Sequence, residues 1–168
     1  MSLPPSFTTP PGRRYGCLAL CLNQDGAVLM LNPAYKPGWI LPGGLAEAGE
    51  WPHDACVRIV ERETSLRVEP EHLAAVDFIP ADPASGSAEG VNYVFDCGVF
   101  HNDTELEVPD DFRASGWVSL TELENFAAPY QARRIRQALA ATARGRTAYL
   151  VKGTPTLPGP GLSKLIGV

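Results

Sequence analysis

The sequence predicts a single α/β domain. Of its 168 residues 45% are hydrophobic, which is enough for one domain with a proper core. Apolar runs typical of strands recur along the chain, and two segments are typical of helices, one opening at Pro52 and one over residues 130–143. We see no internal repeat and no second domain, and we therefore expect one domain over residues 15–152.

The two ends of the chain differ from this domain in composition. Residues 1–14 are proline-rich with few side chains that could be buried, so we expect a flexible arm there. Residues 153–168 carry glycine and proline at a density that disfavours regular structure, so we expect an extended tail. The apolar side chains of this tail could dock on a neighbouring protein.

Strands are expected wherever the chain is apolar over a short run. The turn signal at residues 23–26 should join the first two strands as a hairpin. Residues 80–90 are small and polar and should form a hairpin loop or a mobile flap, and residues 101–113 should form an acidic loop. The runs expected to be strands are residues 15–22, 27–31, 39–41, 73–79, 91–100 and 147–151.

The helix over residues 130–143 is amphipathic. Ile135, Ala138, Leu139 and Thr142 are spaced so that they share one buried face. Several arginines lie in or just after this segment, and the simplest interpretation is that they form its solvent-exposed side. They are Arg133, Arg134, Arg136, Arg144 and Arg146.

Charge and cysteine usage exclude several classes of protein. The net charge of −5 and the sequence pI of about 5.2 argue against nucleic-acid binding through the whole surface. The four cysteines are scattered without metal-ligand spacing, which is typical of buried free thiols in a reducing compartment. No run approaches the ~18 apolar residues of a membrane span, and the N-terminus does not resemble a signal peptide. We therefore expect a cytoplasmic protein without a nucleic-acid or membrane partner.

One stretch carries most of the chemistry, LPGGLAEAGEWPHDACVRIVERETSL at residues 41–66. A short apolar run enters a turn with two glycines, and a loop with Glu47 and Glu50 follows. Pro52 then opens a helix, because proline at the first helical position loses no needed N–H group. This order of strand, glycine turn, acidic loop and helix points backbone N–H groups and the positive end of a helix at an anion.

The same stretch resembles the Nudix box, the signature G-x5-E-x7-R-E-U-x-E-E-x-G-U in which U is an aliphatic residue. Three positions depart from the pattern: Ile59 and Arg62 stand where it has glutamate, and Ser65 stands where it has glycine. A late strand and a short helical turn at residues 117–123 also look like the family. The matching residues are Gly44, Glu50, Arg58, Val60, Glu63 and Leu66.

This resemblance implies a Nudix-type α/β/α sandwich, with a mixed β-sheet between the box helix and the helix over residues 130–143. It implies a hydrolase that cleaves the pyrophosphate bond of a nucleoside diphosphate linked to another group. Mg²⁺ or Mn²⁺ would be the cofactor, because such hard cations prefer carboxylate oxygens and activate a bound water. The partner would be a small nucleotide or a phosphorylated metabolite, and a homodimer is a candidate assembly.

The resemblance also assigns roles to individual residues. Glu63 and Glu50 would be catalytic, with Arg58 orienting Glu50 from behind. The substrate would be contacted by the glycine turn, at Gly43 and Gly44, and we add Arg62 as our own hypothesis, since its cation departs from the pattern but could still attract a phosphate. The metal would be held by carboxylates of the box and of the acidic loop, with Glu47, Glu50, Glu63, Asp110 and Asp111 as candidates.

Two substitutions weaken this expected site. Positions 59, 62 and 63 lie side by side on a helix, and Ile59 offers no ligand atom. A guanidinium at Arg62 beside a divalent ion is repelled by roughly 5–7 kcal/mol at an effective dielectric near 20. Arg62 could instead pair with Glu63 and Glu50 in place of an ion. We therefore expect weakened hydrolysis and a weakly held metal.

Two other functions stay open. The chain could be a binding or sensor protein that holds a nucleotide or phospho-metabolite without cleaving it, because a fold does not guarantee its chemistry. It could also be a scaffold whose tail after Gly153 contacts a partner subunit. Restoring both glutamates, as Ile59→Glu with Arg62→Glu, would separate a working hydrolase from a chain that has lost the reaction.

Overall fold

The chain folds around a mixed eight-stranded sheet in the computed structural model, which describes residues 4–9 and 12–157. Its strands are β1 (Arg14–Asn23), β2 (Val28–Pro33), β3 (Gly43–Leu45), β4 (His72–Ile79), β5 (Gly90–Phe100), β6 (Phe112–Val118), β7 (Ala148–Val151) and β8 (Thr154–Pro155). The order across the sheet is β6–β2–β1–β5–β4–β7–β8, and β3 pairs with β1 beside this path. β1 is parallel to β5 and β4 is parallel to β7, whereas the other neighbours are antiparallel.

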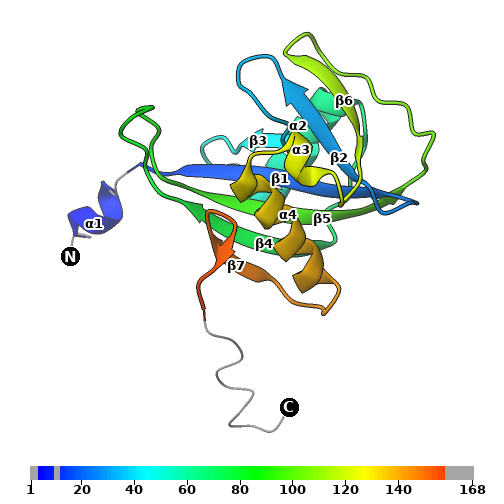
Figure 1. Cartoon of the computed structure of the whole chain (residues 1–168). Helices are drawn as coiled ribbons and strands as arrows, with labels where there is room; N and C mark the ends of the chain where they lie inside the picture. The colour runs from blue at the N-terminus through cyan, green and yellow to red at the C-terminus, as the bar shows by residue number, and fades with distance from the viewer. Residues whose placement is uncertain (1–3, 10–11, 158–168) are drawn as a thin grey trace, which may run out of the picture.

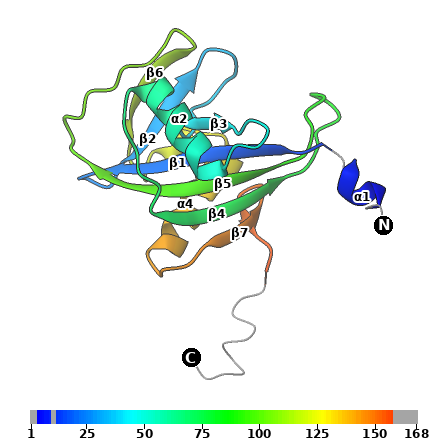
Figure 2. The same ribbon diagram turned by 180° about the vertical axis from the view of Figure 1, so that it is seen from behind.

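Helices cover both faces of this sheet. The box helix α2 (Pro52–Thr64) packs against β1 and β3 on the face that is turned to the viewer in Figure 2. Helix α4 (Pro129–Thr142) packs against β4 on the opposite face, where the short helix α3 (Leu123–Phe126) accompanies it (Figure 1). The α/β/α sandwich with a mixed sheet, predicted from the sequence, is confirmed.

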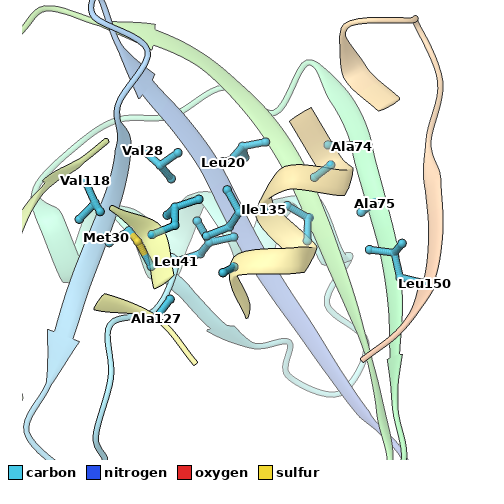
Figure 3. Close-up of a cluster of buried hydrophobic side chains, with 14 residues drawn as sticks. Leu20, Val28, Met30, Leu41, Ala74, Ala75, Val118, Ala127, Ile135 and Leu150 are labelled. Carbon is cyan, nitrogen blue, oxygen red and sulfur yellow. The ribbon is translucent and has the colours of Figure 1, made fainter. Parts of the chain in front are cut away.

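Each face of the sheet has its own hydrophobic core. On the α4 side, Leu20, Met30 and Leu41 pack with Ile135 of α4 and Leu150 of β7 (Figure 3). Each fully buried aliphatic side chain contributes about 1.5–3 kcal/mol to folding, so both helices are held firmly against the strands. The core on the α2 side consists of Cys17, Ala19, Cys21, Leu29, Ala55, Cys56, Ile59, Val60, Leu66, Val68 and Cys97.

The glycine turn before the box is a strand in the structure, which corrects the sequence prediction. β3 pairs antiparallel with β1, and this register places Gly43 opposite Leu18. The φ angle of Gly43 is 132°, and a Cβ atom there would collide with the carbonyl oxygen of Cys17. Only glycine lets the two backbones approach this closely, so Gly43 fixes the position of the segment that leads into α2.

Two further strand predictions need correction. Of residues 39–41 only Ile40 makes a β-bridge, with Leu31. The neighbouring Trp39 N–H is donated to the carbonyl oxygen of Phe126 instead, 2.9 Å away, so no strand can extend through it. The late strand also begins at Phe112, well before the expected residue 117, because β6 pairs with the whole of β2.

The chain ends also differ from expectation where they are described. Pro5–Thr8 form one helical turn, α1, inside the expected flexible arm. Thr154–Pro155 form β8 and pair with β7 inside the expected extended tail. Residues 158–168 of that tail lie outside the described residues.

The four cysteines are free and buried, as the sequence predicts. Cys17, Cys21, Cys56 and Cys97 all belong to the core between α2 and the sheet. Among the described residues, none of the helices is long and apolar enough to cross a membrane.

Candidate functional site

Glu63 lies in the last turn of α2 and faces the β3 backbone. Its Oε2 accepts a hydrogen bond from the Gly43 N–H at 2.9 Å, and the residue is only 7% exposed. Burial raises the pKa of Glu63, while the Gly43 N–H and the positive charge of Arg62 oppose this effect and the negative charge of Asp111 adds to it. A buried carboxylate pinned by a backbone donor is thus placed beside a second carboxylate.

Glu63 and Asp111 share one cavity of about 390 Å³. Asp111 comes from the acidic loop just before β6, so the register of β6 on β2 brings it across to the end of α2. The cavity is therefore built by elements far apart in the sequence. Its lining consists of Tyr35, Gly43, Gly44, Arg62, Glu63, Pro109, Asp111 and Phe112.

The other two predicted glutamates form a separate cluster with Arg58. Arg58 donates to both oxygens of Glu50, from Nε at 2.6 Å and from Nη2 at 2.7 Å. The Glu50 Oε2 also accepts the Glu47 N–H at 2.8 Å, whereas the Glu47 side chain is largely exposed and lies 3.9 Å from Arg58 Nη1. These hydrogen bonds, first of all those from Arg58, lower the pKa of Glu50 to about 2. Arg58 thus orients Glu50, and neither residue lines the Glu63 cavity.

The two box positions that lack the expected glutamate lie in different surroundings. Ile59 is 1% exposed and belongs to the core on the α2 side, directly beneath Gly44. Arg62 lines the cavity, with its Nη2 3.7 Å from Glu63 Oε1, and its side chain is 64% exposed. The ion pair with Glu63 that the sequence allowed is therefore present, but the Glu50 carboxylate is bound to Arg58 and makes no pair with Arg62.

The positive end of the box helix does not border this cavity. The cavity is bordered by the last turn of α2, at Arg62 and Glu63, and no residue of its first turn lines it. The donor that does face the cavity region is the N–H of Gly43 in β3, and it is already bonded to Glu63.

The donor set fits one hard cation and does not fit the several carboxylates of the complete box. Glu63 and Asp111 repel each other across the cavity, and a cation between them would relieve that repulsion. Glu47, Glu50 and the exposed Asp110 do not line this cavity. In the part of the chain that the structure describes, no three His, Cys, Asp or Glu side chains are grouped closely enough to hold a metal.

A larger cavity of about 810 Å³ adjoins the first and shares Tyr35, Gly43 and Gly44 with it. It extends over β1 towards the start of α4 and the loop between β4 and β5. Its size is in the range of small-molecule sites. Basic side chains dominate its charged lining: Arg14, Lys36, Arg133, Arg134 and Lys152.

Arg134 corrects the interpretation of the arginines on α4. Arg133 and Arg136 are exposed, as expected, but Arg134 is 3% exposed and its Nε donates to Asp77 Oδ2 at 2.6 Å. A signal for this burial was present in the sequence, since Arg134 is four residues before the buried Ala138 on the same helical face. The basic lining itself has no local signal, because its residues come from separate elements.

Comparison with known proteins identifies the family. The NUDIX domain model matches residues 12–140. A MutT-like protein from Streptomyces ambofaciens is 36% identical over 76 residues, which is 45% of this chain and 49% of that protein. An ADP-ribose pyrophosphatase from Methanocaldococcus jannaschii is 27% identical over 109 residues, which is 63% of this chain and 62% of that protein. The chain thus spans about half to three fifths of these relatives.

Solved structures agree with the fold. A MutT NUDIX hydrolase from Burkholderia pseudomallei is 26% identical with a TM-score of 0.63, covering 76% of this chain and 98% of that one. A MutT protein from Methanosarcina mazei is 19% identical with a TM-score of 0.65, covering 79% of this chain and 95% of that one, a likeness of fold alone. Members of the family are hydrolases, and they generally use divalent metals. Because the family match covers well over half of its residues, the chain belongs to the Nudix family.

Proposed function

We propose that this chain is a hydrolase that cleaves the pyrophosphate bond of a nucleoside diphosphate linked to another group, and that it does so slowly. The observation that carries the proposal is the cavity in which Glu63 and Asp111 lie beside the Gly43–Gly44 segment. ADP-ribose is the first compound to test, because one relative is an ADP-ribose pyrophosphatase.

In this proposal Glu63 and Asp111 hold one Mg²⁺ or Mn²⁺ ion. Such an ion, when bound, neutralises charge on the phosphates and lowers the pKa of a bound water. The Gly43 N–H fixes the direction of the Glu63 carboxylate. Arg62 competes for Glu63, which makes the ion weakly held, but its exposed guanidinium can also bind a phosphate oxygen. Arg58 acts at a distance, by keeping Glu50 ionised and the loop folded.

The test is the release of AMP from ADP-ribose in the presence of Mg²⁺ or Mn²⁺. Glu63→Gln should abolish the release, because the amide is a poor ligand for a hard cation. The neighbouring aspartates provide a matched comparison: Asp111→Asn should slow the reaction, and Asp110→Asn should have no such effect, since only Asp111 lines the cavity. Equal rates in these two variants would contradict the assignment of Asp111.

A second candidate is a nucleotide-binding protein without cleavage. Arg62, which is paired with Glu63, and the buried Ile59 favour it, because these two residues replace carboxylates of the complete box. Such a protein should gain thermal stability from ADP-ribose to the same extent with Mg²⁺ and with a chelator. A hydrolase should instead show a larger gain with a divalent ion present.

A further inference from the structure

The larger cavity is a concentration of positive charge on an acidic protein. The chain has a net charge of −5, yet among the residues that the structure describes five basic ones line this cavity and Asp82 is the only carboxylate that does so. Asp77 lies beyond the lining and neutralises part of this charge through Arg134. A cavity with this surplus of cations attracts an anion.

Lys36 is the first residue that points to an anionic ligand in this cavity. The residue is half-buried, and its ammonium makes no hydrogen bond or ion pair within the described residues; its nearest partner is the ring of Tyr35, 5.7 Å from Nζ. The pKa of Lys36 is lowered, first by burial and then by the positive charges of Arg134 and Arg14. Three cations thus face one space, and the guanidinium of Arg14 makes one hydrogen bond among the described residues, to a backbone carbonyl oxygen, that of Ala88.

Arg134 is the second and independent sign. Its side chain is 4% exposed, and its Nε is paired with Asp77. Its Nη2 is buried and finds no hydrogen-bond partner among the described residues, although the residue lines the cavity. A buried guanidinium N–H without a partner is unfavourable in a folded protein, so its position is explained if a ligand oxygen accepts from it.

The strand register places Arg14 and Asp77, the partner of Arg134, away from the glycine segment, where the proposed function puts the diphosphate. The two cavities meet at Gly43, which pairs with Leu18 of β1. Two residues earlier on β1, Gly16 pairs with Asn92 of β5, and Asn92 pairs with Asp77 of β4, the partner of Arg134. At ~3.3 Å per residue, the row of Gly16, Asn92 and Asp77 is about 7 Å from Leu18 along β1, and Arg14 is about 13 Å from Leu18. A diphosphate held at the glycine segment therefore leaves Arg14 and Arg134 for another part of the ligand, and Lys36 lines the same larger cavity as these two without lining the smaller one.

We propose that the ligand carries a third anionic group beyond its two phosphates, and that Arg14, Lys36 and Arg134 recognise this group. The substrate class is then a nucleoside diphosphate derivative with a phosphomonoester on its nucleoside or an acidic group on its other half. This inference rests on the proposed function only in placing the diphosphate at the Gly43–Gly44 segment. The discrimination itself is a property of binding and needs no hydrolysis.

Titration calorimetry without divalent metal tests the proposal with two matched pairs of compounds. ADP-ribose is compared with its 2′-phosphate derivative, and UDP-glucose with UDP-glucuronate. In at least one pair we expect the more anionic member to bind about tenfold tighter or better, the factor that one charge-assisted hydrogen bond supplies. The pair that shows the preference tells whether the anion belongs to the nucleoside or to the other half.

Lys36→Met is the decisive variant, because within the described residues the Lys36 ammonium makes no hydrogen bond or ion pair whose loss could unfold the chain, and its one contact is with the ring of Tyr35. It should remove the preference and leave binding of the less anionic member nearly unchanged. Arg67→Met is the matched control, since it deletes one positive charge from a side chain that is 91% exposed and outside the cavity; the preference should survive. Equal affinities in both pairs, no binding of any of the four compounds, or a preference that survives Lys36→Met would overturn the proposal. A clear preference without AMP release would refute only the proposed hydrolysis.

Discussion

The buried ion pair between Asp77 and Arg134 gives a quantitative test of how the larger cavity is supported. Asp77 on β4 is fully buried; its Oδ2 accepts the Nε of Arg134 at 2.6 Å, and its two oxygens accept the Gly153 N–H at 3.0 and 3.1 Å. One carboxylate therefore ties together β4, α4 and the β7–β8 hairpin. Asp77→Asn keeps the shape but leaves a buried guanidinium without a counter-charge, which costs about 3–5 kcal/mol.

This loss of stability predicts a shift of the melting temperature Tm. At ~2.1 cal/mol/K per residue the 168-residue chain has an unfolding entropy of about 0.35 kcal/mol/K, so Asp77→Asn should lower Tm by about 9–14 °C. Thermal unfolding followed by circular dichroism measures it. The control is Glu124→Gln, which breaks the exposed pair with Arg136 and should lower Tm much less, because an exposed ion pair contributes little to stability. A shift for Asp77→Asn no larger than that of the control would refute this reasoning.

Three other substitutions test the box. Gly43→Ala should destabilise the fold, in urea unfolding, by clearly more than the roughly 1–2 kcal/mol expected for Gly49→Ala, because both have positive φ but only a Cβ at Gly43 would meet Cys17. The pKa of Glu50 is held at about 2 rather than 4.5, so its carboxylate stabilises the fold above pH 4.5 and loses this effect as the pH falls towards 2. Glu50→Gln should therefore reduce stability at pH 7 and flatten its fall between pH 4.5 and 2, whereas an unchanged acid limb would contradict the bidentate pair. Ile59→Glu should lower the free energy of unfolding by about 3–5 kcal/mol, because it buries an unpaired carboxylate. If added Mn²⁺ does not restore the stability of this variant in urea unfolding, position 59 does not face the metal.

The fold could be predicted from the sequence because its signals are local. Alternating apolar runs gave β1, β4 and β5 nearly to their ends, and the apolar spacing of residues 130–143 gave α4. The box motif located α2 and the layer it occupies. What failed were the elements set by partners far along the chain: β3 exists because Gly43 can approach β1, and β6 begins early because β2 is available to pair with it.

The candidate site could be predicted only in part, for the same reason. Glu63 and the Arg58–Glu50 pair follow from spacing within one motif. Asp111 lines the Glu63 cavity and the adjacent Asp110 does not. This difference is set by the register of β6 on β2. The basic cavity has no motif at all, since Lys36 and Arg134 are almost a hundred residues apart in the chain and meet only after β4 and β5 have been placed.

The central claim is that one cavity with Glu63 and Asp111 still cleaves a pyrophosphate bond although Ile59 and Arg62 have replaced two carboxylates. A single-turnover experiment tests it most directly, with the protein in excess over ADP-ribose and Mn²⁺ present. We expect slow release of AMP by the natural chain and none by Glu63→Gln, with both proteins binding ADP-ribose. Bound ADP-ribose that stays intact on the natural chain, or AMP released equally fast by Glu63→Gln, would contradict the claim.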